Sequence, residues 1–253
     1  KYAIADITID FKDGTDIYWA RSQVAERLAN VTDVLPASVS GGMAPISTPL
    51  SDMYMFTLEG PQSLAEKRRT LDWIIRPALR TVPGVADVNA LGGFVESYEV
   101  RPDMAALAAA GLTVDDLRQA IERSNRNDGA GRLKTGEESL IVRSVGAVKS
   151  LEDLAAIVVR AQNGRTIKVG DLAEVRLGHL TRYGAVSKNG TGEAVQGLVI
   201  GLRGMDAAAI VEGVKARLDE IAPSLPKGMT IDVFYDRSDL IGRAVGTVEK
   251  ALV

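Results

Sequence analysis

The sequence GLVIGLRGMDAAAIVEGVKARLDEIAPSLPKGMTIDVFY, residues 197–235, contains the pattern from which the fold can be predicted. It starts with an apolar run typical of a strand at residues 197–200 and continues with amphipathic helical spacing over residues 207–221. A Pro-Lys-Gly turn lies within residues 225–228, and a second strand pattern follows at residues 229–235. A strand, a helix and a strand in this order predict a βαβ unit with a right-handed crossover.

The same order occurs twice more along the chain. One copy has a strand pattern at residues 53–56, a helix at residues 63–80 and a strand at residues 85–91. An earlier copy has a strand pattern around Ile7 and a helix over residues 15–31. Helices on one face of a mixed sheet, in the ferredoxin-like manner, are the simplest assembly of such units. The sequence therefore predicts an α+β fold of repeated ferredoxin-like βαβ subdomains.

Residues 97–178 do not repeat this pattern. A polar, glycine-rich arm at residues 125–131 interrupts them, and it is too polar to be core. Around the arm the patterns predict three helices and four strands, at residues 104–110, 114–124 and 151–158 and at residues 98–101, 139–144, 165–169 and 173–177. We expect an inserted α+β subdomain whose arm is long enough to reach a neighbouring molecule.

Local signals mark where the helices begin. Ser63 and Glu66 have the spacing of a capping box, in which each side chain satisfies an otherwise unpaired backbone N–H. Residues 113–116 and 150–153 are weaker relatives of that motif. Pro77 falls inside the predicted helix and removes one backbone hydrogen bond, so a kink is expected there.

Composition excludes several classes of protein. The 253 residues include 30 Lys and Arg against 33 Asp and Glu, so there is no basic field to gather nucleic acid. Without cysteine the chain has no disulfide, zinc ribbon or thiol nucleophile. No stretch approaches the roughly 18–20 apolar residues of a membrane-spanning helix. The chain opens at Lys1 within a strand pattern and stops within a helical pattern at residues 238–253, which favours a piece of a longer protein.

The polar motifs do not indicate an enzyme. No nucleophile elbow, phosphate loop or dinucleotide glycine pattern is present. His179 is the single histidine, lies in a predicted loop without a carboxylate neighbour, and is interpreted as solvated. Asp10, Asp13 and Asp16 lack the alternate spacing of a calcium loop. They are interpreted as a glycine turn in which Thr15 caps the following helix.

Two strands carry candidate metal ligands. Alternation places Met53 and Met55 on one face of the first strand and Asp52 on the other. Paired thioethers suit a soft cation and a carboxylate suits a borderline one, although methionine is also an ordinary core residue. On the second strand Asp87 and Asn89 share a face and offer oxygen ligands, although a solvated strand face is the preferred interpretation of this pair. Neither set is a full coordination sphere.

Several motifs resemble one family of transporters. They are DGTDIYWAR at residues 13–21, VADVNALGG at 85–93, KNGTGEAV at 188–195 and YDRSDLI at 235–241, together with Asp72-Trp73 and Pro77-Ala78-Leu79. In this order they are similar to the resistance-nodulation-division (RND) transporters, in the heavy-metal efflux branch of the cobalt-zinc-cadmium type. The resemblance covers essentially the whole chain.

The resemblance implies a domain organisation in the first large periplasmic loop. Residues 1–40 would be part of a first porter subdomain, and residues 41–94 with 180–237 would form a second one. Residues 95–179 would be the inserted docking subdomain. Residues 238–253 would lead into a transmembrane helix.

The resemblance also implies a function. The chain would be the porter and docking region of a proton-driven, homotrimeric inner-membrane pump. The pump would export divalent cations such as zinc, cobalt, cadmium or nickel as its substrate and would need no cofactor. The partners implied are a periplasmic adaptor and an outer-membrane channel, and the isolated chain is expected to be monomeric. Related pumps often have acidic residues at the positions of Asp52 and Asp87. A copper or silver pump is disfavoured because its methionine cluster lies beyond Val253.

Two alternatives stay open. A pump of the same superfamily that exports organic amphiphiles needs an aromatic pocket, and only 5% of the residues are aromatic. A module that acts purely through protein contacts of the glycine-rich arm needs no metal ligand. Metal titration distinguishes these alternatives from cation export.

Overall fold

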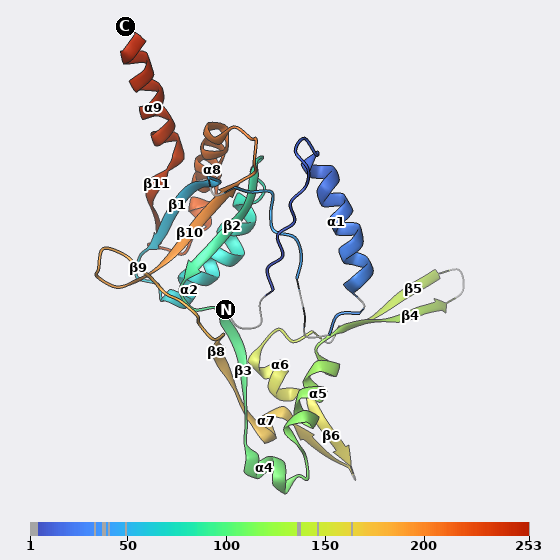
Figure 1. Cartoon of the computed structure of the whole chain (residues 1–253). Coiled ribbons are helices and arrows are strands. Elements are labelled where there is room, and N and C mark those ends of the chain that lie inside the picture. The colour runs from blue at the N-terminus through green and yellow to red at the C-terminus, as the bar shows by residue number, and fades with distance from the viewer. Residues whose placement is uncertain are drawn as a thin grey trace.

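The computed structural model describes residues 5–32, 34–36, 39, 41–48, 50–135, 138–145, 147–162 and 164–252. Figure 1 shows a sheet backed by helices, an elongated lobe below it with a projecting arm, a separate helix from the N-terminal part and a C-terminal helix that extends away from the sheet.

The main sheet consists of β1 (Asp52–Glu59), β2 (Val85–Gly92), β10 (Glu193–Gly201) and β11 (Thr230–Asp236), with the short β9 (Val186–Ser187) added to β10. The strand order is β11-β1-β10-β2, and each neighbouring pair is antiparallel. Strands β1 and β2 are therefore parallel with β10 between them, and β10 and β11 are parallel with β1 between them. These two interlocked split βαβ units confirm the predicted ferredoxin-like arrangement.

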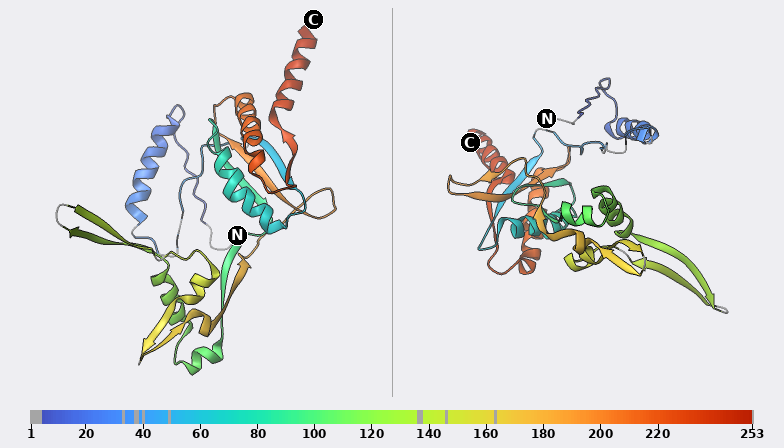
Figure 2. Two further views of the ribbon diagram at one scale, coloured as in Figure 1. Left: turned by 180° about the vertical axis from the view of Figure 1, so that it is seen from behind. Right: turned by 90° about the horizontal axis from the view of Figure 1, so that it is seen from below.

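The helices of both units pack on one face of this sheet, as Figure 2 shows from behind. They are α2 (Leu64–Thr70), the π-helix η1 (Leu71–Ile75), α3 (Arg76–Leu79), α8 (Ala207–Ile221) and the short 3₁₀ helix η2 (Ala222–Ser224). Their apolar side chains form the main core with alternate residues of the strands, among them Phe56, Val88 and Val199. The predicted capping box is confirmed, because Ser63 and Glu66 exchange both bonds at the start of α2.

The irregular turn at Pro77 has a definite form. Proline has no N–H to donate to the carbonyl of Trp73, so regular α-helical bonding fails just there. The turn before it widens into η1, where the Arg76 N–H bonds the Leu71 carbonyl five residues earlier. Such π-turns are a known way of relieving a break in the helical ladder.

The inserted lobe hangs from the antiparallel pair β3 (Glu96–Pro102) and β8 (Ala173–His179). It continues through α4 (Met104–Ala109), α5 (Val114–Ser124), α6 (Leu151–Ala156), the pair β6 (Val158–Gln162) and β7 (Arg165–Lys168), and α7 (Val169–Leu172). The predicted helix at residues 151–158 is too long, because Ile157 is already extended and Val158 begins β6.

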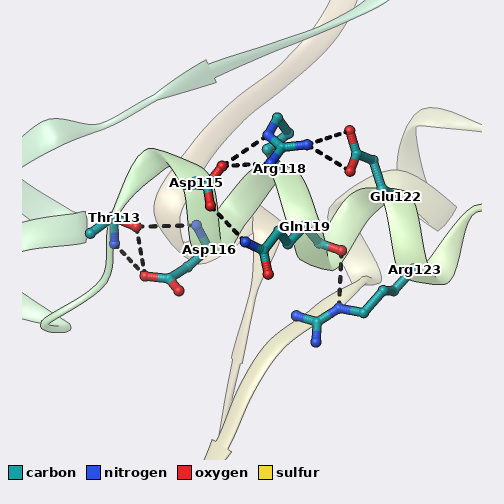
Figure 3. Close-up of polar contacts among 7 residues, drawn as sticks. All are labelled: Thr113, Asp115, Asp116, Arg118, Gln119, Glu122 and Arg123. Carbon is teal, nitrogen blue, oxygen red and sulfur yellow. Dashed lines mark hydrogen bonds and ion pairs between the residues drawn. The ribbon is translucent and has the colours of Figure 1, made fainter. Parts of the chain in front are cut away.

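Helix α5 shows how the sequence separates the two faces of a surface helix. Its first turn has a second capping box, in which the Asp116 N–H bonds Thr113 Oγ1 at 3.1 Å and the Thr113 N–H bonds the Asp116 carboxylate at 2.8 Å. On the outer face Arg118 bridges Asp115 and Glu122 (Figure 3). The opposite face packs into the core of the lobe. The charged ladder contributes little by itself, and the packed face holds α5 in place.

The glycine-rich segment at residues 125–131 is predicted from sequence to be a polar arm outside the core, and in the structure most of it is a strand. Strands β4 (Asn127–Thr135) and β5 (Glu138–Val145) pair as a hairpin that projects from the lobe (Figure 1). At its base the Val148 N–H bonds the Asn125 side-chain oxygen at 2.9 Å. This bond ties together the two ends of the arm.

The strand predicted around Ile7 in the N-terminal part is not formed. Helix α1 (Ile17–Thr32) forms as expected, but residues 5–16 contain no strand, and Ile7 is 80% exposed. An alternating segment becomes a strand only when a neighbouring strand pairs with it, and none of the described segments does so. The helix cap is Asp16, which accepts the Trp19 N–H at 2.7 Å, whereas the Thr15 hydroxyl bonds the Lys12 carbonyl.

The last element is helix α9 (Arg237–Leu252), which covers most of the predicted C-terminal helix. Among the described residues no helix has both the length and the apolar character needed to cross a membrane.

Candidate cation-binding face

The face of the main sheet that the helices leave open carries four of the five predicted ligands. Directly opposite residues in an antiparallel pair share a face. Ile200 of β10 lies opposite Asp52 on one side and Asp87 on the other, and Leu198 lies opposite Met55 and Asn89 in the same way. Ile200 and Leu198 are only half-buried, whereas Val199 between them belongs to the main core under the helices. Asp52, Met55, Asp87 and Asn89 therefore surround these two apolar side chains.

Met53 is not part of this face, so the predicted pair of thioethers is wrong. A bulge between Asp52 and Tyr54 shifts the register by one residue. The shift turns Met53 into the main core, where it is 5% exposed and its methyl group lies against Gly201. Asp52 then shares the open face with Met55, whereas simple alternation places them on opposite faces.

The two carboxylates of this face differ in their surroundings. Asp87 is held by Arg76, whose Nη2 lies 3.2 and 3.1 Å from its two oxygens, and Arg80 Nε is 3.6 Å away. Its charge is thus already compensated, and it ties α3 to β2. The Asp52 carboxylate has no hydrogen-bond or ion-pair partner among the described residues. Asp52 is the better candidate ligand of the two.

The arrangement does not form a complete coordination sphere. Asp52 and Asp87 are two strands apart, so their Cα atoms are separated by about 10 Å at the usual strand spacing. No group of three or more acidic, histidine or cysteine side chains in the described part of the chain is placed to hold one metal ion. A zinc ion, for comparison, usually takes four ligands in proteins. The face can offer a cation Asp52, the Met55 thioether and the Asn89 amide as a partial set.

A charged cluster on the same face was missed from the sequence. Lys188 Nζ donates to Thr57 Oγ1 at 2.8 Å, to Glu59 Oε1 at 2.7 Å and to Asp232 Oδ2. Its partners on β1 lie 131 and 129 residues away in the sequence, so no local pattern connects them. The only local signal is the pair Asn189-Gly190 after Lys188, which is typical of a tight turn. In the structure Asn189 adopts a φ of 54°.

The ion pairs change the titration of this cluster. The hydrogen bond from Lys188, followed by the one from Thr57, holds the pKa of Glu59 below its ordinary value. Bonds to Asp232 and then to Glu59 raise the pKa of Lys188. The stabilisation through Glu59 is therefore present above its unfolded pKa and is lost as the pH falls through its lowered folded value.

A Lys188→Met variant tests this cluster. We expect the free energy of unfolding at about pH 7 to fall by about 1 kcal/mol, since the partly exposed carboxylates are screened by solvent. Urea unfolding between about pH 7 and about pH 3 should show a flatter loss of stability than in the wild type, because the variant removes the largest cause of the lowered pKa of Glu59 and leaves only the bond from Thr57. Lys227→Met, at an exposed lysine in the turn before β11, is the control. A variant as steeply acid-dependent as the wild type contradicts the assignment.

A pocket of about 330 Å³ lies where the sheet joins the lobe. Two guanidinium groups line it, and both are already paired. Arg68 donates to Asp72 and to the Gly92 carbonyl, each at 2.7 Å. Arg182 binds both oxygens of Glu193 and lies 4.4 Å from the centre of the Phe94 ring. Both guanidinium groups of this pocket therefore connect parts of the protein to one another, and neither is left free to bind an anion.

His179 lies close to this pocket. The sequence predicted it in a loop, and that prediction is wrong. His179 is the last residue of β8, and its ring centre is 4.9 Å from that of Phe94. It remains exposed and has no carboxylate partner among the described residues.

The AcrB/AcrD/AcrF family profile matches residues 1–253, the whole chain. The chain therefore belongs to the AcrB/AcrD/AcrF family, and the resemblance to heavy-metal RND transporters drawn from its motifs is confirmed.

Individual relatives are similar over almost all of its length. The chain is 36% identical over 263 residues to the cobalt-zinc-cadmium resistance protein CzcA of Cupriavidus metallidurans, which covers 100% of this chain and 25% of that protein. It is 36% identical over 251 residues to the cation efflux system protein CusA of Escherichia coli K12, covering 98% of this chain and 24% of that protein.

A solved structure shares the fold. The crystal structure of a heavy metal efflux pump superposes with a TM-score of 0.83 at 32% identity, over 95% of this chain and 24% of that chain. The chain thus spans about a quarter of the length of the relatives it matches.

Proposed function

We propose that this chain forms the periplasmic porter and docking region of a proton-driven heavy-metal efflux pump that exports divalent cations. The observation that carries the proposal is the similarity over nearly the whole chain, in sequence and in fold, to a heavy metal efflux pump of known structure. The relatives named above are described as cation efflux and metal resistance proteins.

The domain organisation proposed for the pump follows the topology of the chain. Residues 41–94 and 180–237 form the ferredoxin-like unit and would be a porter subdomain. Residues 95–179 would be the docking subdomain, with the β4–β5 hairpin reaching toward the next protomer of a homotrimer. Residues 1–40 would complete a first porter subdomain with other parts of the pump, and residues 238–253 would lead toward the membrane. An adaptor and an outer-membrane channel would be the further partners.

The cation would meet this chain on the open face of the sheet. Asp52 and Met55 on β1, and Asn89 across β10 on β2, offer one charged oxygen, one sulfur and one amide oxygen. This mixture favours a borderline cation such as zinc, cobalt, cadmium or nickel. Asp87 would contribute only if Arg76 released it, and Met53 would contribute only if the bulge in β1 rearranged. An incomplete set that is spread over two strands with β10 between them predicts weak binding.

Isothermal titration calorimetry of the chain with Zn²⁺, Co²⁺ and Ni²⁺ tests the proposed site. We expect saturable heat with at least one of these ions, and we expect Asp52→Ala to abolish it because Asp52 supplies the charged ligand. Asp219→Ala, at an exposed aspartate on the helix-covered side of the sheet, is the matched control and should bind as the wild type does. No heat at millimolar metal favours a module that acts only through protein contacts, and heat that survives Asp52→Ala places the ligands elsewhere.

A further inference from the structure

The strand β11 runs into the helix α9 without a connecting loop. Asp236 is the last residue of β11, and Arg237 is the first residue of α9. Figure 1 shows α9 extending away from the edge of the sheet at this point. No residue lies between the two elements, so a rotation of the sheet edge acts directly on the start of the helix.

The carboxylate of Asp236 joins three elements. Its Oδ1 accepts the Ser238 N–H at 2.8 Å and the Ser238 hydroxyl at 2.6 Å, as an N-cap residue does for the first turn of a helix. Its Oδ2 pairs with Lys215 Nζ, which comes from the neighbouring helix α8. One side chain thus connects the end of β11, the start of α9 and the side of α8.

The ion pair and hydrogen bonds of Asp236, called the joint below, lie in surroundings that are largely shielded from solvent. The Asp236 side chain is only 10% exposed, and Tyr54, directly opposite it on β1, is buried. Burial works to raise the pKa of Asp236, but the ion pair with Lys215 and the bonds from Ser238 together hold the pKa below its ordinary value. Removing one partner of such a pair leaves a charge with little solvent to compensate it.

Apolar packing holds α9 only weakly beyond this joint. Leu240, Val245 and Val248 are each at least 50% exposed. Figure 1 shows that the far end of α9 extends beyond α8 and the sheet. The bonds of Asp236 to Ser238 and Lys215 are therefore the polar contacts that hold the start of α9 to the sheet and to α8.

We propose that Asp236, through Lys215 and Ser238, fixes the direction of α9 relative to α8 and the sheet, so that the sheet and α9 turn as one body. The role of this joint in transport rests on the proposed function: it would pass movement between the porter sheet and the membrane part of the pump. Asp236 and Lys215 are positioning residues in this account, and neither touches the cation. The joint itself is a property of this chain and can be measured without metal.

The absence of cysteine allows a direct test in the full chain. Spin labels at Glu212→Cys on α8 and Ala244→Cys on α9, both exposed positions, report the distance between the two helices by double electron–electron resonance. The wild type should give one narrow distance population. Asp236→Asn, which keeps a capping oxygen but loses the charge, and Lys215→Met, which keeps the length of the side chain, should each broaden that population or split it.

The controls separate the joint from general loss of charge or fold. Arg217→Met removes a positive charge from the same helix, where Arg217 pairs with Glu220, and should leave the distance unchanged. The double variant Asp236→Asn with Lys215→Met should be no broader than either single variant, because each removes the same coupling. Circular dichroism establishes that each variant is folded. Because Lys215 is about half exposed, its variant keeps the test available if Asp236→Asn does not fold.

Unchanged distances in both single variants overturn the proposal, and so does equal broadening in Arg217→Met. None of these outcomes bears on the metal titration, so failure of the joint and failure of the proposed function are distinguishable.

Discussion

Replacing Phe56 by alanine is expected to lower the free energy of unfolding of the main sheet and its helices by about 3–5 kcal/mol. Phe56 is fully buried at the centre of the core, and its ring lies against Gly197 on the neighbouring strand. A Cβ added at Gly197 would be 2.3 Å from the ring, so this glycine provides the space that Phe56 fills. Urea unfolding followed by circular dichroism measures the loss.

The same contact predicts a specific coupling. Gly197→Ala alone should destabilise by about 1–3 kcal/mol, because the ring has to move aside. In the Phe56→Ala background the added methyl group occupies part of the cavity, so the double variant should be more stable than the sum of the two single losses predicts. Additive losses would show that the ring and the glycine do not share this space.

Replacing Gly92 by alanine is expected to cost about 3 kcal/mol or more, through strain and a backbone clash together. Gly92 has a φ of 72°, which a side chain disfavours, and its Cβ would be 2.3 Å from the Ala194 carbonyl oxygen. That oxygen belongs to the backbone of β10 and cannot rotate away. Hydrogen exchange should show the loss in β2 and β10, at the point where the chain enters the lobe.

Gly111 provides the matched control for Gly92. It also has a left-handed φ, of 61°, but nothing lies within 4 Å of its added Cβ. Gly111→Ala should therefore cost only the conformational strain, about 1 kcal/mol. Equal losses at the two glycines would mean that the contact with Ala194 is relieved without cost.

Much of the fold could be predicted from local patterns. The bounds of α5 and α8 follow from helical spacing and, for α5, from the cap at Thr113, because a helix is bonded within its own segment. The order of strands and helices around residues 53–91 and 197–235 was enough to indicate two split βαβ units. The strand expected around Ile7 failed because a strand requires a partner that its own segment does not contain.

The candidate site was only half predictable. Asp52 and Met55 were identified as polar or thioether side chains on a strand, but alternation gave them the wrong relation to one another. The bulge at Met53 depends on how β1 pairs with β10, almost 150 residues later in the chain. The clusters around Lys188 and Asp236 escaped for the same reason, since their partners meet only when distant strands and helices come together.

Local patterns alone thus predicted the class of fold, the starts of α2 and α5 and the family, because periodicity, capping and motifs act over a few consecutive residues. The face on which each candidate ligand lies, the pairing of Asp87 with Arg76, and the contacts of Asp236 with α8 and α9 follow from the assembled fold. Register and ion pairing are settled by contacts between segments far apart in the chain, and a shift of a single residue moves a side chain from the open face into the core.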